Sequence, residues 1–229
     1  MTIRVLLADD QPLLRHGFAM ILSAQADIEV IGEAADGAEA VRLTGLLRPD
    51  VVLMDVRMPG MDGIEATRKI TSVSPPTRVI ILTTFDVDEY AFDGLRAGAS
   101  GFLLKNARPD ELLSGIRSVA TGDAVLAPST TRRVLDAFAD GFVSRASSEA
   151  AGPDGPGSLG PLGALTSREL EVFTEMAAGS TNKEIAQQLH LSETTVKTHV
   201  VRVLAKLGLR DRTQAVIFAY ERGIKRPQS

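Results

Sequence analysis

The feature that most constrains this chain is an alternation of short apolar runs with segments of helical periodicity across residues 1–120. The apolar runs are rich in branched side chains, and several are apolar at consecutive positions, as strands covered on both faces should be. Five such pairs predict a parallel sheet with helices packed on both faces. The expected strands are Ile3–Ala8, Ile28–Ile31, Val51–Met54, Val79–Leu82 and Gly101–Leu104, and the expected helices are Pro12–Ala24, Ala38–Leu47, Ile64–Ser72, Glu89–Ala97 and Pro109–Ala120.

The pattern changes after Thr121, which indicates a second domain. A helical stretch near Thr130–Ala139 leads into Ser144–Gly163, which is dense in Ser, Gly and Pro and is typical of a flexible linker. A length of 229 residues suits two domains, each large enough for its own core. We expect an α/β domain at 1–122, a linker at 123–161 and an all-α domain at 162–229. The expected helices of the all-α domain are Ser167–Ala178, Asn182–Leu189, Glu193–Leu207 and Arg212–Arg222.

Composition narrows the classes of function. The chain has no cysteine and three histidines, which excludes disulfides and thiolate chemistry and leaves oxygen atoms as the expected ligands of any metal. No run of about 18 apolar residues occurs, and two acids interrupt the first apolar run too early for a signal peptide, so we expect a cytoplasmic protein without a membrane partner. Residues 1–162 carry 15 basic against 22 acidic residues, and residues 163–229 carry 10 against 7. This asymmetry favours a cation site in the first domain and a polyanion partner for the second.

Polar side chains follow the expected strands at the point where each strand ends. Asp9 and Asp10 follow the first strand, Asp55 the third, Thr83 the fourth and Lys105 the fifth. Because the carboxyl ends of parallel strands share one rim, where open α/β sheets bind ligands, these groups should converge. Three carboxylates would repel one another unless a cation neutralised them, and Mg²⁺ suits such oxygen ligands. A carboxylate beside Mg²⁺, a lysine and a hydroxyl has the parts for phosphoryl transfer to a side chain.

These five side chains, in this order, resemble the receiver domain of bacterial two-component response regulators over about residues 1–122. The resemblance implies a flavodoxin-like (βα)5 fold with Asp55 as the phosphoryl acceptor. It also implies that Mg²⁺ is bound by Asp9, Asp10, Asp55 and the backbone carbonyl of Arg57. Any one acid alone has a plainer interpretation as a helix cap or a turn residue, but their joint placement at strand ends favours the functional interpretation.

The same resemblance assigns roles to the ends of the fourth and fifth strands. It implies that Thr83 and Lys105 contact the phosphoryl oxygens. Phe102, three residues before the lysine, stands where the family carries an aromatic side chain that changes rotamer on activation. Thr83 and Phe102 are therefore the expected switch, although Phe102 can also be an ordinary core aromatic.

The helices of the second domain carry clear start signals. Thr166, Thr181, Ser192 and Asp211 stand at N-cap positions, and the first two have a glutamate three residues on, which fits a capping box. Only residues 190–192 separate the second helix from the third, and a link this short predicts a helix-turn-helix. On the third helix, apolar residues at three- and four-residue spacing should pack inward and leave hydroxyl and basic side chains facing outward.

The segments Leu165–Val172, Gly179–Ala186 and Leu191–Val200 resemble the LuxR-type helix-turn-helix over about residues 162–226. Together with the receiver, they make the chain similar to the NarL/FixJ family of response-regulator transcription factors over nearly its whole length. Hydroxyls and cations on such a helix bind phosphates or reach base edges in a major groove, whereas Val201 can make only an apolar contact. The expected contacts with double-stranded DNA are Lys183, Thr194, Thr195, Lys197, Thr198, Val201, Arg202 and Lys206.

The fourth helix of this domain also repeats apolar residues at three- and four-residue spacing. The family resemblance implies that Ala215, Val216, Ala219 and Tyr220 form a dimer contact on DNA, which would pair two half-sites about one helical turn apart. In a domain this small, the same residues can instead complete the hydrophobic core. The sequence leaves both interpretations open.

These observations predict a response regulator, not an enzyme, in which a sensor histidine kinase phosphorylates Asp55 and homodimerisation and promoter binding follow. The main alternative is constitutive DNA binding by a protein whose receiver-like domain only binds other proteins, and the intact acidic set argues against it. A phosphatase of the haloacid dehalogenase type would need an acid two residues after its nucleophile, where Arg57 stands. Polar strand ends also argue against an apolar pocket for a small-molecule ligand.

Overall fold

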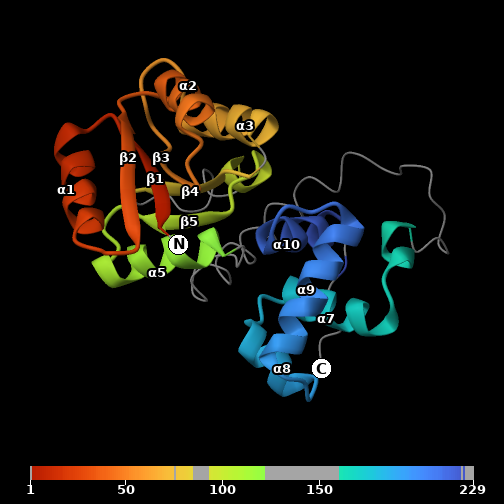
Figure 1. Cartoon of the computed structure of the whole chain (residues 1–229). Coiled ribbons are helices and arrows are strands. Elements are labelled where there is room, and N and C mark those ends of the chain that lie inside the picture. Colours follow the sequence, from red (N-terminus) through yellow and green to blue (C-terminus); the bar gives the residue numbers. More distant parts are fainter. Residues whose placement is uncertain (1, 75, 85–92, 122–159, 223, 225–229) are drawn as a thin grey trace. The chain divides into compact units, whose positions relative to one another are not determined.

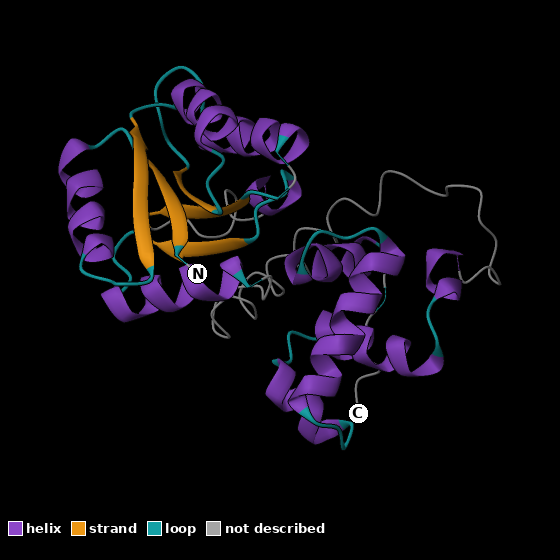
Figure 2. Ribbon diagram, viewed as in Figure 1, coloured by secondary structure: helices purple, strands orange, loops and turns teal. Residues whose placement is uncertain are grey.

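The computed structural model describes residues 2–74, 76–84, 93–121, 160–222 and 224. The chain divides into two compact units, Met1–Leu126 and Ala127–Ser229, each with its own hydrophobic core. Figure 2 shows strands and helices in the first unit, whereas the described part of the second is helical. No helix within these described ranges is long and apolar enough to cross a membrane.

The first unit is a five-stranded parallel sheet in the order β2-β1-β3-β4-β5, which confirms the predicted α/β class and the flavodoxin-like topology. Figure 1 shows α1 and α5 on one face of the sheet and α2 and α3 on the other. The strands are β1 (Ile3–Ala8), β2 (Ile28–Ala34), β3 (Val51–Asp55), β4 (Arg78–Thr83) and β5 (Gly101–Leu104), and the helices are α1 (Pro12–Ser23), α2 (Gly37–Leu47), α3 (Gly63–Val73) and α5 (Pro109–Ala120).

The predicted strand at Ile28–Ile31 is too short, because β2 continues to Ala34. Val5 pairs with Val30 but Leu6 pairs with Gly32, so Ile31 is an extra residue at which the register shifts. Such a bulge disturbs the regular pattern of a strand, and the Gly and Glu that follow it resemble the start of a loop. The expected helix Glu89–Ala97 lies partly outside the described residues, and its residues 93–96 are helical.

The central strands are buried because helices cover both faces of the sheet. Every residue of β3 is buried, and β4 is buried from its second residue onward. Phe18 and Leu22 of α1 and Ile116 of α5 pack with these strands in one cluster. Full burial of one such side chain contributes about 1.5–3 kcal/mol to stability. This core fixes the positions at which the strands end.

The start of α3 lies unusually close to the end of β3. The Gly63 N–H donates to the Val56 carbonyl at 2.9 Å. A Cβ atom added at Gly63 would lie 1.8 Å from the carbonyl oxygen of Asp55. The Asp62 side chain caps the helix by accepting from the Glu65 N–H at 2.7 Å, as turn chemistry with a helix cap predicts. The loop after Asp55 is therefore held by backbone contacts that tolerate no side chain at position 63.

The second unit contains the four predicted helices around one core. Val172, Phe173 and Val200 are buried in it, and the rings of Phe173 and Phe218 meet edge to face with centroids 6.1 Å apart. A short 3₁₀ helix (Gly160–Ala164) precedes them, beginning at the end of the expected linker 123–161 and continuing into the expected all-α domain. The rest of that linker, with Thr130–Ala139, lies outside the described residues. The helices are α7 (Ser167–Ala177), α8 (Asn182–Gln188), α9 (Glu193–Leu207) and α10 (Arg212–Glu221).

We predict that Gly63→Ala destabilises the first unit by about 1–3 kcal/mol, because the added methyl group must displace the backbone at Asp55. Gly45→Ala is the matched control, since Gly45 lies within α2 and a Cβ there meets no atom within 4 Å. That control should stabilise the unit by about 0.5–1 kcal/mol. Urea unfolding followed at amides of the first unit by hydrogen exchange measures both changes. Equal effects of the two substitutions would contradict the close approach.

Candidate functional site

The acidic residues predicted to converge do so at the carboxyl ends of β1 and β3. Asp9 and Asp10 follow β1 directly, and Asp55 is the last residue of β3, the neighbouring strand. One oxygen of each of these three carboxylates lies within 4.8 Å of the other two. The sheet order reverses between β2-β1 and β1-β3, so this is the switch point at which open α/β sheets bind ligands.

Lys105 lies between two of these carboxylates. Its Nζ is 2.8 Å from Asp9 Oδ2 and 2.8 Å from Asp55 Oδ2, and its side chain is 5% exposed. The lysine backbone is fixed as well, because its N–H donates to the Thr83 carbonyl at 2.7 Å, which continues the β4–β5 pairing by one residue. The structure thus brings Asp9, Asp55 and Lys105 together as the sequence predicts.

Burial and charge act in opposite directions on these groups. Burial raises the pKa of Asp55 above its ordinary value, and the hydrogen bond from Lys105 only partly opposes the rise. For Lys105, burial alone would lower the pKa, but the hydrogen bonds to Asp55 and Asp9 prevail and the pKa is raised. Lys105 is therefore cationic at neutral pH, and its ammonium group stabilises negative charge on oxygen atoms at the Asp55 carboxylate.

Thr83 and Thr84 line the same pocket as Asp55 and Lys105. Thr83 is 7% exposed and ends β4. Phe102, the other expected switch residue, is 1% exposed and pairs with Ile81 in the sheet. The structure describes one conformation of each of these two side chains, so the switch stays a prediction.

The donor set fits a hard divalent cation. Three carboxylates around one point supply the oxygen ligands that Mg²⁺ prefers, and Arg57 lines the same pocket, with its N–H donating to Asp55 Oδ1 at 3.3 Å. Sequence reasoning overlooked Gln11, which also lines the pocket and whose N–H donates to Asp9 Oδ1 at 2.8 Å. Its position directly after the paired acids is the signal that could have found it.

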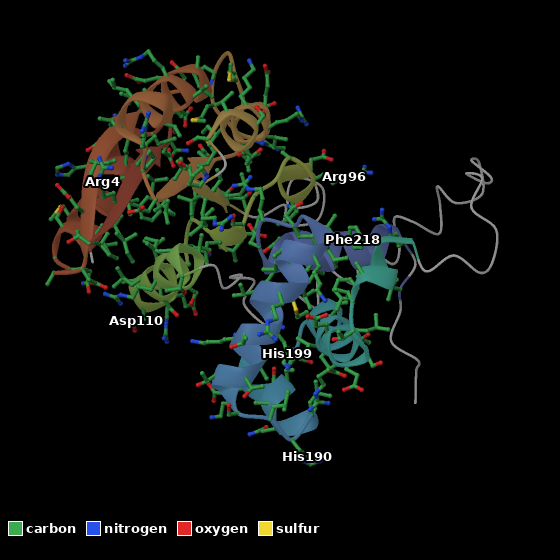
Figure 3. The ribbon with its side chains drawn as sticks, turned by 45° about the vertical axis from the view of Figure 1, so that its right-hand side comes forward. Arg4, Arg96, Asp110, His190, His199 and Phe218 are labelled. Atoms are coloured by element: carbon green, nitrogen blue, oxygen red, sulfur yellow. The ribbon has the colours of Figure 1, made fainter. Side chains whose placement is uncertain are left out.

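In the second unit, α8 and α9 form the predicted helix-turn-helix. His190 occupies the link in a left-handed conformation, with φ 53°, and Figure 3 shows it at the tip of the turn. Thr166, Thr181 and Ser192 cap their helices by accepting from backbone N–H groups, as predicted. Asp211 accepts from the Gln214 N–H at 3.0 Å and so caps α10. Each cap satisfies one of the backbone donors left open at a helix start.

The outward face of α9 carries most of the residues expected to contact DNA. Val196, Val200 and Val203 face the core, and the opposite side of the helix is exposed. Val201 is 66% exposed on this side of the helix. His199, labelled on α9 in Figure 3, keeps Nδ1 buried and without a hydrogen-bond partner among the described residues. The exposed members of the expected set are Lys183, Thr194, Lys197, Thr198, Val201, Arg202 and Lys206, with Thr195 half-buried.

Lys206 differs from the other cations of this set. Its Nζ donates to Glu169 Oε2 at 2.6 Å, and this carboxylate, 5% exposed, also accepts from the Thr166 N–H at 2.8 Å. The sequence identified Glu169 as a capping-box acid but not as an ion partner on another helix. The structure therefore gives Lys206 a place in the packing of α7 against α9, which competes with its expected contact to DNA.

The residues expected at the dimer contact are mostly buried in the second unit. Ala215 and Ala219 are at most 1% exposed and belong to the core cluster of the second unit, which supports the alternative that they complete the core. Val216 is 6% exposed, and the side chain of Tyr220 lies outside the described ones. Buried methyl groups such as those of Ala215 and Ala219 are not accessible to a second copy.

Comparisons with known proteins agree with both units. Residues 5–117 match the response regulator receiver domain, and residues 163–219 match the bacterial regulatory proteins of the luxR family. The uncharacterized transcriptional regulatory protein YxjL of Bacillus subtilis is 47% identical over 222 residues, covering 97% of each chain. The transcriptional regulatory protein LiaR of the same organism is 44% identical over 218 residues, covering 95% of this chain and 97% of LiaR. The crystal structure of ChrA, a response regulator of a heme-sensing two-component system, is 34% identical and covers 97% of this chain and 98% of that chain, with a TM-score of 0.50.

A receiver domain with an acidic pocket, followed on one chain by a LuxR-type helix-turn-helix, defines a DNA-binding response regulator. The chain belongs to the NarL/FixJ family of two-component transcriptional regulators, whose members regulate transcription and are not enzymes.

We predict that the contribution of Glu169 to stability disappears in acid. The hydrogen bonds from Lys206 and the Thr166 N–H lower the pKa of Glu169 from 4.5 to about 2. A carboxyl group whose pKa is lowered by folding stabilises the folded state fully at pH values above its pKa in the unfolded chain. This stabilisation is lost as the pH falls from about 4.5 towards 2. The difference in stability between wild type and Glu169→Gln should therefore shrink over that interval.

Hydrogen exchange of α7 amides across this pH range measures the difference. Glu171→Gln is the control, because Glu171 lies on the same helix, is 50% exposed and pairs with Arg168. An exposed pair contributes little at any pH. A wild-type advantage that stays constant down to pH 2 would show that the Glu169 carboxylate is not held by these contacts.

Proposed function

We propose that this regulator is phosphorylated on Asp55 by a sensor histidine kinase, with Mg²⁺ in the acidic pocket, and that phosphorylation controls dimerisation and promoter binding. The observation that carries the proposal is Lys105 Nζ, which lies 2.8 Å from both Asp9 and Asp55 at the switch point of the sheet. The DNA-binding function supports a place in the cytoplasm. We also propose domain boundaries at 1–122, 123–161 and 162–229, supported by family matches over 5–117 and 163–219.

The chemistry follows from the placement of the chain's own groups. A carboxylate oxygen of Asp55 attacks the phosphorus of a phosphohistidine, forming the O–P bond as the P–N bond to the histidine breaks. Lys105 already lies against the carboxylate and balances the charge that the phosphoryl oxygens bring. Asp9, Asp10, Asp55 and the Arg57 carbonyl would hold Mg²⁺, which, when bound, neutralises charge on the transferred group.

The response to phosphorylation is a change of population between two arrangements. Thr83 lines the pocket beside Asp55, so its hydroxyl is placed to hydrogen-bond a phosphoryl oxygen there. A phosphoryl oxygen in the pocket is a new hydrogen-bond acceptor and favours the arrangement in which the Thr83 side chain turns towards it. The space that this side chain leaves can admit the ring of Phe102 on the next strand. This coupling makes Thr83 and Phe102 the proposed switch.

On the second unit, we propose that the start of α9 enters the major groove of double-stranded DNA. Lys197, Thr198 and Val201 lie on the exposed side of the helix, where they can reach base edges, and Arg202 and Lys183 can reach the phosphates. The Thr198 hydroxyl donates to the Thr194 carbonyl at 3.0 Å, and its oxygen can still accept a hydrogen bond from DNA. Two copies on adjacent half-sites would form the active species.

We predict that Asp55→Asn abolishes phosphorylation and leaves the fold intact, because the amide oxygen is too weak a nucleophile. Intact-protein mass after incubation with a small acyl-phosphate donor and Mg²⁺ should show one adduct on wild type and none on the variant. Asp110→Asn is the control, since its carboxylate on α5 is 86% exposed and is labelled in Figure 3. A variant that still carries the adduct would place the acceptor elsewhere.

If wild-type protein shows no adduct, the incubation is repeated with a second phosphoryl donor. A phosphorylated histidine kinase then replaces the small donor, and failure with both would overturn the proposed phosphorylation. A gel shift of the phosphorylated and unmodified protein on palindromic DNA measures the dependence of binding on phosphorylation. Equal binding by both forms would favour the constitutive DNA-binding alternative.

We predict that Lys197→Ala weakens DNA binding and reduces its salt dependence. A lysine in the major groove also neutralises phosphate charge, and the loss of one neutralised phosphate lowers the slope of log K against log salt concentration by about 0.9 per copy. Lys69→Ala is the control, because Lys69 lies on α3 of the first unit and pairs with Glu65 at 2.8 Å. Fluorescence anisotropy with labelled DNA at several salt concentrations gives both slopes. Unchanged affinity and slope would remove Lys197 from the DNA interface.

A further inference from the structure

Arg15 on α1 connects the acidic pocket to the edge strand β2. Its Nη1 donates to the backbone carbonyl of Asp9 at 2.7 Å, and its Nε donates to Glu33 Oε2 at 2.7 Å. The Arg15 side chain is only 17% exposed, whereas Glu33 is 43% exposed. Neither residue lines the pocket, and neither is needed for the chemistry proposed at Asp55.

The Asp9 carbonyl belongs to the peptide unit that joins Asp9 to Asp10. Because a peptide unit is planar and rigid, a contact that holds its oxygen also restricts the position of the Asp10 Cα atom. Before this unit, the Asp9 N–H donates to the Ala34 carbonyl at 3.2 Å. After it, the Arg15 N–H donates to the Gln11 carbonyl at 3.1 Å, which starts α1. Between these two points, the guanidinium holds the turn that presents Asp9 and Asp10.

The two contacts of Arg15 have different weights. The ion pair with the half-exposed Glu33 contributes little stability, because water screens it. The hydrogen bond from the charged guanidinium to the Asp9 carbonyl is partly buried and is the stronger contact. The main effect of Glu33 is therefore to aim the guanidinium, whose planar fork then reaches the Asp9 carbonyl.

We propose that Arg15, aimed by Glu33, is a positioning residue that sets the Asp9–Asp10 peptide for binding a divalent cation. The inference rests on the Mg²⁺ site of the proposed function and assigns two residues outside it a part in that site. Groups that orient metal ligands from behind typically change metal affinity by about 10–100-fold when they are removed. A misplaced Asp10 would weaken binding of the cation, while Asp55 and Lys105 keep their positions on β3 and after β5.

The test is a titration of the full-length protein with Mg²⁺ alone, followed by amide NMR shifts of the residues around the pocket. Arg15→Gln should raise the Mg²⁺ dissociation constant by about tenfold, the lower end of the range for such groups. Arg4→Gln is the matched control, because Arg4 Nη1 also donates to a backbone carbonyl, that of Arg48 at 3.1 Å, at the other end of β1. Figure 3 labels Arg4 on the first unit.

Phosphorylation by a small acyl-phosphate donor supplies a second readout. In proportion to its loss of affinity, Arg15→Gln should need about tenfold more Mg²⁺ than wild type to reach half of its maximal phosphorylation rate. At saturating Mg²⁺, its rate should equal that of wild type. Arg15→Lys should restore part of the affinity, since lysine can donate to the Asp9 carbonyl but cannot contact Glu33 at the same time. Glu33→Gln keeps an acceptor for Arg15 and should cause a smaller loss, and it tests the proposal if Arg15 variants do not fold.

The outcomes separate this inference from the proposed function. Wild-type protein that does not bind Mg²⁺ would overturn the proposed metal site and this inference with it. If wild-type protein binds Mg²⁺ and folded Arg15→Gln binds it with the same affinity, this inference alone is overturned. A rate that stays low at saturating Mg²⁺ would also overturn it, because that result would mean that Arg15 supports the fold of the pocket and does not position the metal ligands.

Discussion

The contact on which the first unit depends is that of Lys105 with Asp9 and Asp55. Two of the three clustered carboxylates, Asp9 and Asp55, are buried and repel each other strongly, and the buried ammonium of Lys105 offsets this repulsion. A buried charge is costly without its partners, so Asp9, Asp55 and Lys105 require one another. The same contact leaves Asp55 with a raised pKa and a cation against one oxygen. The pocket is therefore held in a state that favours an added anion together with a second cation.

Backbone geometry around the pocket serves this contact. The sheet order puts the ends of β1, β3 and β4 side by side, and the Lys105 N–H continues the β4–β5 pairing, so the lysine extends from the next strand towards the acids. On the other side, the close approach of Gly63 to Asp55 holds the loop that carries Arg57. Strands and loops with little freedom to move place a carboxylate and its countercharge more precisely than flexible loops do.

The sequence predicted these groups because strand ends are visible in the pattern of apolar runs, and polar residues at strand ends converge in a parallel sheet. It also predicted the helix caps, since capping depends on residues three positions apart. It could not predict the ion pair of Glu169 with Lys206, because the two residues are 37 positions apart and meet only when α7 packs on α9. The β2 bulge and the contact of Arg15 with Glu33 escaped for the same reason: both depend on pairing between elements. For Ala215 and Ala219, the sequence did show a pattern, but its regular apolar spacing fitted a core and a dimer contact equally well.

The pairing of cations in the second unit has a consequence for how it binds DNA. The sequence gives residues 163–229 ten basic residues, but the structure commits several of them to internal contacts: Lys206 to Glu169, Arg168 to Glu171 and Arg212 to Asn182. Within the described part of this unit, Lys183, Lys197 and Arg202 are exposed and in no ion pair. Affinity for DNA grows with the number of phosphates neutralised. Because each copy brings its own exposed cations, two copies on adjacent half-sites double the number of phosphate contacts that one copy can make. A switch that controls pairing of two copies would therefore control DNA binding without any change in the helix that contacts the bases.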